Sequence, residues 1–283
     1  MLKLGIIGYP LEHTLSPVMH TAALQQLNIN GEYKAYEIKE ENLEREFKKL
    51  VKSGITGLSV TIPFKTKIIP LLDSLTETAR LIGAINTLRV DSSGLTTGEN
   101  TDAKGFYDSI PKRFKSISDK TVTVLGCGGS ARAICIAFLL NKVRTLKVYG
   151  RNPLKLKEFE KFLLGRKEKL SSKTSLSTSQ LDKLDLEDTF ILVNTTPCGM
   201  YPKINDTPVK KEKLAELPEK SLVYDIIYNP KETRLLKNAK ELNLKTLNGI
   251  EMLARQGASS LSFWLGKDIS AMGVMRLAVE NSL

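Results

Sequence analysis

The 283-residue sequence has few of the residues that build metal centres and disulfide frameworks. It contains two histidines and three cysteines, and Cys127, Cys135 and Cys198 share no Cys-x-x-Cys spacing. Zinc sites that depend on several histidines are therefore excluded, and a disulfide framework is not expected. We predict no metal site, and we predict a cytoplasmic location because free thiols are typical of that compartment.

Long apolar runs are missing as well. No stretch approaches the roughly 18 apolar residues that a membrane span needs. The amino-terminal residues read as a strand and a turn, without the apolar core and cleavage site of a signal peptide. We therefore predict no membrane partner.

No Gly-x-Ser-x-Gly elbow occurs, so a Ser-His-Asp hydrolase is not expected.

Basic residues outnumber acidic ones, and the formal net charge is +11. Residues 142–173 hold eleven lysines and arginines against three glutamates, so a net +8 lies in this one stretch. Few aromatic residues interleave with these charges, and no nucleic-acid-binding signature occurs. We interpret the stretch as a solvated helix face that could attract an anionic cofactor, and we predict no nucleic-acid partner.

Strand-like segments alternate with helical ones along most of the chain. The serine- and threonine-rich residues 171–179 are expected to form a surface loop. Repeated strand–helix units predict an α/β fold with parallel sheets and helices on both faces. Asp91-Ser-Ser-Gly94 reads as a hairpin turn between two of the expected strands. The expected strands are residues 2–7, 33–38, 57–62, 84–90, 95–97, 121–125, 146–149, 190–194, 222–226 and 244–247.

A glycine-rich turn, Gly126-Cys-Gly-Gly-Ser-Ala131, follows one expected strand and opens an expected helix. This is the setting of the dinucleotide-binding fingerprint. Gly126 permits the tight turn, Gly128 lets the backbone approach a pyrophosphate, and Ala131 allows close helix–strand packing. The amino end of the helix, with Gly129 and Ser130, would supply N–H donors.

The residues after the next strand favour NADP over NAD. An NAD site would carry an acidic residue here to hold the ribose 2′-hydroxyl. Arg151 and Lys155 instead offer positive charge to a 2′-phosphate.

Two polar motifs bring a lysine and an aspartate into this setting: Ser59-Val-Thr-Ile-Pro-Phe-Lys65 and Gly98-Glu-Asn-Thr-Asp-Ala-Lys-Gly105. A Lys–Asp pair in a chain with a dinucleotide turn suggests hydride transfer involving a small polyhydroxylated substrate. Hydride addition to a ketone builds negative charge on oxygen, so a proton donor must lie within hydrogen-bond reach. Because histidine is scarce, Lys65 is the natural donor, and Asp102 would orient it. The alternative for the pair is an ordinary surface ion pair.

Taken together, the motifs resemble the shikimate dehydrogenase family over nearly the whole chain. The family implies NADP-dependent reduction of 3-dehydroshikimate to shikimate, an oxidoreductase reaction on a CH–OH group in aromatic amino-acid and chorismate biosynthesis. The similar segments are residues 8–20, 59–65, 83–87, 100–106, 194–200, 225–230 and 249–256.

The resemblance also assigns roles to single residues. Lys65 and Asp102 would be the catalytic pair. The substrate-binding residues would be Thr14, Ser16, Ser59, Thr61, Asn86, Tyr228 and Gln256. The cofactor-binding residues would be Gly126, Gly128, Gly129, Ser130, Ala131, Arg151, Asn152, Lys155, Thr195, Gly249 and Met252.

The expected architecture is two α/β domains with the active site in a cleft between them. Residues 1–103 and 242–283 would form the substrate-binding and catalytic domain. Residues 104–241 would form a Rossmann-type NADP-binding domain. We expect the chain to act as a monomer or a homodimer.

The sequence departs from the family pattern at two expected substrate residues. Thr14 stands where serine is usual, and Ser59 stands where asparagine is common. A quinate or dual quinate/shikimate dehydrogenase using NAD is therefore the first alternative, although no acidic residue lies near Arg151. The second alternative is a non-catalytic homologue that binds NADP or a shikimate-like ligand. The presence of both Lys65 and Asp102 argues against this alternative.

Overall fold

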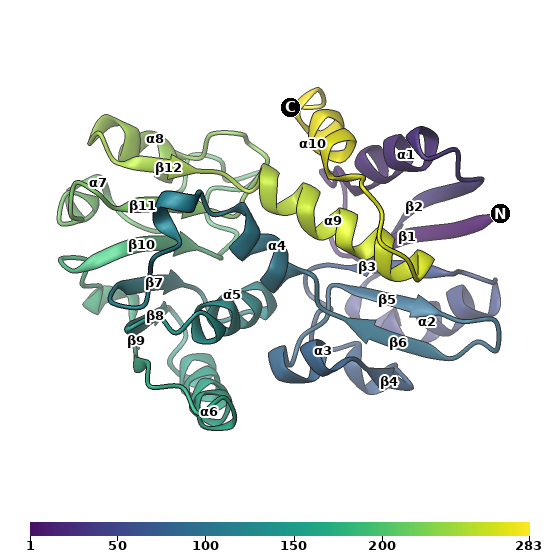
Figure 1. The fold of residues 1–283 in the computed structure, drawn as a ribbon, viewed down its shortest axis with the longest axis horizontal. Coiled ribbons are helices and arrows are strands. Elements are labelled where there is room, and N and C mark those ends of the chain that lie inside the picture. Colours follow the sequence, from purple (N-terminus) through teal and green to yellow (C-terminus); the bar gives the residue numbers. More distant parts are fainter. The chain divides into compact units, whose positions relative to one another are not determined.

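Two six-stranded sheets, each covered by its own helices, organise residues 1–283 of the computed structural model (Figure 1). The first unit comprises Met1–Gly105 and Leu253–Ser282, and the second comprises Phe106–Met252. The predicted α/β class with two domains is confirmed.

The sheet of the first unit is mixed, with strand order β2-β1-β3-β5-β6-β4. Its strands are β1 (Leu2–Gly8), β2 (Gly31–Glu37), β3 (Gly57–Val60), β4 (Ser74–Leu75), β5 (Thr87–Val90) and β6 (Thr96–Glu99). The expectation of parallel strands does not hold for β5, which runs antiparallel to β3 and, across the predicted hairpin turn, to β6. In this hairpin turn the Asp91 carboxylate accepts hydrogen bonds from the Ser93 and Leu95 amides, and Gly94 takes a φ of +86°.

The helices of the first unit cover both faces of its sheet. They are α1 (Ser16–Gln26), α2 (Leu43–Lys52), α3 (Glu77–Ile82), α10 (Met272–Glu280) and the parts of α4 (Asp102–Ser109) and α9 (Ile250–Leu265) that belong to the unit. Leu58 and Val60 of β3 pack with Phe47 of α2 in the core of one face. On the other face α1 packs against α10, and Met19 lies against the backbone of Gly257 in α9.

The sheet of the second unit is entirely parallel, with strand order β12-β11-β10-β7-β8-β9. This is the Rossmann order, in which β8 and β9 lie on one side of β7 and the later strands β10, β11 and β12 lie on the other. The strands are β7 (Thr121–Leu125), β8 (Thr145–Gly150), β9 (Ser175–Gln180), β10 (Thr189–Asn194), β11 (Leu222–Asp225) and β12 (Lys245–Leu247). The helices are α5 (Gly129–Leu140), α6 (Pro153–Lys169), α7 (Lys211–Leu214) and α8 (Arg234–Glu241).

Residues 171–179 were expected to form a loop, and the structure corrects this. Ser175–Gln180 forms β9, which pairs in parallel with β8 at the edge of the sheet. Only Leu176, Thr178 and Ser179 of the strand are partly buried. Backbone pairing rather than side-chain burial stabilises this strand, so its composition carries little hydrophobic signal.

Residues 242–252 also lie differently from the expected domain division. They belong to the second unit, because β12 pairs in parallel with β11.

None of the helices combines the length and hydropathy that crossing a bilayer requires.

Candidate active site

Lys65 and Asp102 form the closest polar pair of the first unit's predicted site residues. The Lys65 ammonium donates to Asp102 Oδ2 across 2.5 Å. The side chains are 14% and 5% exposed, so this is not the ordinary surface ion pair that the sequence alone allowed. Lys65 lies in the turn after β3, and Asp102 is the first residue of α4, where a carboxylate is favoured by the helix dipole.

Asn86 links this pair to α9. Its side-chain amide donates to Asp102 Oδ1 at 2.9 Å and to Gln256 Oε1 at 3.0 Å. The Asn86 side-chain oxygen accepts from the backbone amide of Thr101 at 2.7 Å. The first unit thus brings together four predicted residues, Lys65, Asn86, Asp102 and Gln256, from four separate segments of the chain.

Two residues without a predicted role hold this network in place. The Asn100 side chain accepts from the amide of Asp102 at 3.0 Å and donates to the carbonyl of Ala84 at 2.8 Å. The Thr101 hydroxyl donates to the carbonyl of Gln256 at 3.0 Å. Both residues are buried, and their place within the Asn-Thr-Asp motif was the one available signal.

Gly105 permits the close approach of α4 and α9. A Cβ atom built at Gly105 would lie 3.0 Å from both the Cβ and the backbone nitrogen of Gln256. Any larger residue would displace Gln256, whose side-chain amide also donates to the carbonyl of Leu253 at 2.9 Å.

Four of the predicted substrate-binding residues lie at the carboxyl ends of β1 and β3 and at the start of α1. Thr61 donates its backbone amide to the carbonyl of Ile7 at 3.0 Å, and its methyl group comes within 2.3 Å of a Cβ built at Gly8. The Thr14 hydroxyl accepts weakly from the amide of Ser16 at 3.4 Å. Ser16 is the first residue of α1, and Ser59 is buried on β3.

In the second unit, the glycine turn joins β7 to α5 as predicted. Gly126 has a φ of +108°, which only glycine adopts without strain, and a Cβ there would lie 2.6 Å from Thr195 Oγ1. A Cβ at Gly128 would meet nothing within 4 Å, so the space beside this backbone is open. Helix α5 begins at Gly129 with no acidic residue and no side-chain cap in its first turn. Its first-turn amides therefore form a cradle suited to an anion.

The turns after β10 and β11 support this cradle. The Thr195 hydroxyl donates to the carbonyl of Leu125 at 2.6 Å, at the end of β7. Beside it, the buried Asp225 accepts from Thr233 Oγ1 at 2.7 Å and from Asn194 Nδ2 at 3.0 Å. Burial raises the pKa of Asp225 to about 6, although these donors oppose the shift. Neither Asp225 nor Asn194 had a predicted role of its own.

Positive charge lies at the amino end of α6, next to the glycine turn. Arg151 and Lys155 are exposed, and the Asn152 side chain caps the helix by accepting from the Lys155 amide at 3.0 Å. Burial raises the pKa of the Cys127 thiol in the glycine turn, and the charge of Lys155 opposes that rise.

Three further predicted site residues belong to the second unit: Tyr228, Gly249 and Met252. Gly249 tolerates no side chain, because a Cβ there would lie 1.9 Å from the carbonyl oxygen of Ile226. Met252 is buried in α9, and Tyr228 is partly exposed in the turn after β11.

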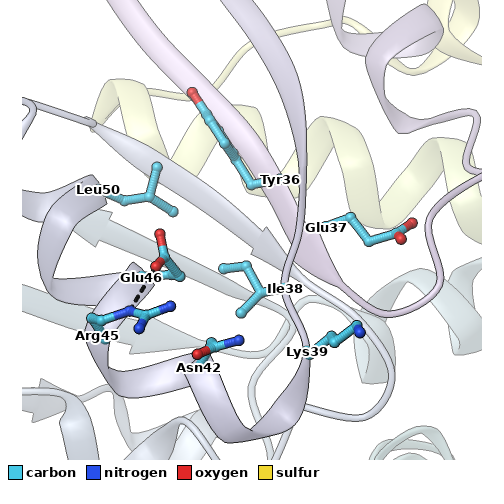
Figure 2. A pocket seen from close by; sticks show the side chains of 8 residues that line it. All are labelled: Tyr36, Glu37, Ile38, Lys39, Asn42, Arg45, Glu46 and Leu50. Atoms are coloured by element: carbon cyan, nitrogen blue, oxygen red, sulfur yellow. Dashed lines mark hydrogen bonds and ion pairs between the residues drawn. The ribbon is translucent and has the colours of Figure 1, made fainter.

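A groove of about 300 Å³ lies on the first unit, away from these residues (Figure 2). It is lined by Tyr36, Glu37, Ile38, Lys39, Asn42, Arg45, Glu46 and Leu50, none of which is a predicted site residue. The structure has no cluster of three or more metal-ligating side chains, and its three cysteines are unpaired.

The parallel sheet, the glycine turn and the Lys–Asp pair define an α/β enzyme of the dinucleotide-binding class. Residues 6–88 match the family model for the shikimate dehydrogenase substrate binding domain. A shikimate dehydrogenase (NADP(+)) of Synechocystis is 39% identical over 280 residues, which cover 99% of this chain and 95% of that relative. The chain belongs to the shikimate dehydrogenase family.

Solved structures agree with this membership over the full length. A crystal structure of a shikimate dehydrogenase in complex with NADP+ has a TM-score of 0.88 and 36% identity, covering 100% of this chain and 96% of that one. The shikimate 5-dehydrogenase of Thermus thermophilus, in complex with NADP(H) and shikimate, has a TM-score of 0.83 and 31% identity, with complete coverage of both chains.

Proposed function

We propose that this protein catalyses the NADP-dependent, reversible reduction of 3-dehydroshikimate to shikimate in aromatic amino-acid biosynthesis. The observation that carries the proposal is the 2.5 Å contact between Lys65 and Asp102, whose carboxylate also accepts from Asn86. The family to which the chain belongs consists of NADP-dependent dehydrogenases. Asp102 and Asn86 serve to fix Lys65 in one orientation.

Lys65 is the proton donor and acceptor of this reaction. NADPH, when bound, supplies the hydride that reduces the ketone carbon. Negative charge then develops on the substrate oxygen, and the Lys65 ammonium neutralises it by giving up a proton. In the reverse direction Lys65 takes the proton from the hydroxyl group. Asn86 and Gln256 hold the neighbouring ring hydroxyls by hydrogen bonds.

The substrate carboxylate is bound by hydroxyl groups in this proposal. Thr14, Ser16, Ser59 and Thr61 would donate to it, and the family resemblance also assigns Tyr228 to the substrate. Hydroxyl donors suit a carboxylate because each bond to a charged acceptor is stronger than a bond between neutral groups.

NADP is held by the second unit in this proposal. The residues fit the cofactor, because the open space at Gly128 and the uncapped start of α5 suit a pyrophosphate. Gly126, Gly129, Ser130, Ala131 and Thr195 complete this cradle. Arg151, Asn152 and Lys155 would hold the 2′-phosphate, and Gly249 and Met252 would lie beside the nicotinamide.

We further infer a cytoplasmic location, in keeping with three unpaired thiols. All of the proposed residues come from one chain, which is compatible with a monomer or a homodimer. We propose that residues 1–103 with the carboxyl-terminal helices supply the substrate-binding and catalytic domain.

Absorbance at 340 nm tests the proposal with purified protein, shikimate or quinate, and NADP+ or NAD+. We expect rapid NADPH formation from shikimate and NADP+ alone. Quinate oxidation with NAD+ would favour the alternative dehydrogenase, to which the Ser59 and Thr14 departures point. Silence in all four mixtures, with NADP+ binding intact, would mean a non-catalytic homologue.

A further inference from the structure

Tyr33 and Ser59 form a buried hydroxyl pair that spans a strand of the first sheet. The Tyr33 phenol on β2 donates to Ser59 Oγ on β3 across 2.8 Å, and the two residues are 6% and 8% exposed. The strand β1 runs between them, where Tyr33 is in register with Leu4 and Ser59 with Ile6. Leu4 and Ile6 are two residues apart, so all four side chains face the same side of the sheet.

The direction of this bond leaves the Ser59 proton for another acceptor. A serine hydroxyl has one proton and two lone pairs, and Tyr33 already uses a lone pair. The cross-strand neighbour of Ser59 on the same face is Thr87, and the Thr87 hydroxyl makes no hydrogen bond. Thr61, which is proposed to bind the substrate carboxylate, lies two residues beyond Ser59. The Ser59 proton is therefore available to a substrate carboxylate.

Aromatic rings hold the Tyr33 phenol in its place. His20 of α1 stacks on Tyr33 with centroids 4.4 Å apart and planes within 5°. Trp264 of α9 lies 6.1 Å from Tyr33 and is itself fixed by donating Nε1–H to the carbonyl of Leu88 at 2.9 Å. Burial lowers the pKa of His20 to about 3, so its ring is neutral against the phenol at neutral pH.

We propose that Tyr33 is a positioning residue for the substrate carboxylate, acting through Ser59. The phenol occupies the acceptor side of the Ser59 hydroxyl and so directs the Ser59 proton toward the carboxylate. Two hydroxyl groups here do the work of the asparagine that is common at position 59 in the family. This inference rests on the proposed function, because it takes shikimate as the substrate.

Tyr33→Phe removes the phenol hydroxyl while keeping the ring. We expect it to raise the KM for shikimate about fivefold to twentyfold, since a well-directed hydrogen bond to a charged group is lost. We expect kcat to stay within about twofold and the Kd for NADP+ to be unchanged, because neither Lys65 nor the second unit is altered. The inhibition constant of a shikimate analogue with a hydroxymethyl group in place of the carboxylate should not change.

A double-mutant cycle with Ser59→Ala separates positioning from general structural support. If Tyr33 acts through Ser59, Tyr33→Phe has no further effect on KM once Ser59 is alanine. In addition, Ser59→Asn should restore a low KM in the Tyr33→Phe background, because an asparagine amide can donate without help from a phenol. The matched control is Tyr36→Phe on the same strand. Tyr36 faces the opposite side, in the groove of Figure 2, so its KM should equal that of the wild type.

Each outcome bears on the inference. An unchanged KM for Tyr33→Phe, or an equal increase in the Ser59→Ala background, overturns it. A fall in kcat with equal weakening of the hydroxymethyl analogue also overturns it, because that result indicates a distorted site. If the wild-type protein does not turn over shikimate at all, the proposed function itself fails and the inference falls with it.

Discussion

The two units build their polar sites from different kinds of chemical group. In the first unit the groups are side chains bonded to one another, as in the contacts of Asn86 with Asp102 and Gln256. In the second unit they are mostly backbone groups, at Gly126 and at the start of α5, with charge added at the surface by Arg151. Side chains suit one particular substrate, whereas backbone amides suit the phosphates common to many nucleotides.

The difference predicts how each unit responds to substitution. Conservative side-chain changes in the first unit should affect turnover and leave cofactor affinity alone. Loss of surface charge in the second unit should affect cofactor affinity and leave kcat alone. Substitutions that separate turnover from cofactor affinity test this contrast.

Asp102→Asn should lower kcat by about 10²- to 10⁴-fold, the range typical of acid–base groups. Asparagine keeps the shape of the side chain but loses the charge that holds the Lys65 ammonium. The Kd for NADP+, measured by fluorescence titration, should stay within about twofold of the wild type. Asp108→Asn on the same helix is the matched control and should keep full kcat. A normal kcat for Asp102→Asn would break the comparison.

Arg151→Ala combined with Lys155→Ala should raise the Kd for NADP+ by about 10- to 100-fold, since charge-assisted bonds to a phosphate are lost. Affinity for NAD+, which has no 2′-phosphate, should not change. Lys161→Ala with Lys169→Ala removes the same amount of charge from further along α6 and serves as the control. Equal losses in both double variants would mean that only the general positive field matters.

Gly105→Ala should lower kcat/KM about tenfold and destabilise the protein by about 1–3 kcal/mol, because the new methyl group overpacks against Gln256. In contrast, Gly165→Ala in α6 meets nothing within 4 Å and should stabilise by about 0.5–1 kcal/mol. Urea denaturation measures both changes. A stabilised, fully active Gly105→Ala variant would contradict the close contact of α4 and α9.

Buried His20 should make the first unit sensitive to acid. Burial lowers its pKa from 6.5 to about 3, so the unfolded chain binds the proton first as the pH falls. The contribution to stability is complete above pH 6.5 and is lost toward pH 3. Between about pH 7 and pH 5 this loss amounts to about 2 kcal/mol. The His20→Phe variant should lack this loss when urea unfolding is compared at the two pH values.

Asp225 should give the second unit the opposite dependence. Burial raises its pKa from 3.8 to about 6, so the folded state holds the proton longer as the pH rises. Stability therefore falls between about pH 4 and pH 6 and then levels off. Asp225→Asn should remove this slope. If both variants changed the pH dependence in the same direction, the contrast between the two buried groups would be refuted.

The sequence predicted the glycine turn of the second unit for physical reasons. Gly126 and Gly128 carry a local signal, since strand, turn and helix are contiguous and the turn can only work in that setting. Hydrophobic spacing also located most strands, but not β9, whose serines are held by backbone pairing. The motifs indicated Lys65 and Asp102.

Sequence spacing did not give the long-range contacts of the first unit. Asn86 and Gln256 are 170 residues apart in the chain, and the Tyr33–Ser59 bond crosses an intervening strand. No local pattern encodes such pairs, because they depend on strand order and register. The hairpin between β5 and β6 was predicted from Asp91-Ser-Ser-Gly94, because that turn signal is local, whereas the antiparallel pairing of β5 with β3 was not.

The most direct test of the division of labour between the units is the rate of NADPH formation from shikimate by Lys65→Ala at saturating NADP+, measured beside its Kd for NADP+. If the first unit performs proton transfer and the second binds the cofactor, kcat falls by about 10³-fold or more while that Kd stays within about twofold. A Lys65→Ala variant with the kcat of the wild type would contradict this division, since proton transfer would then depend on another group.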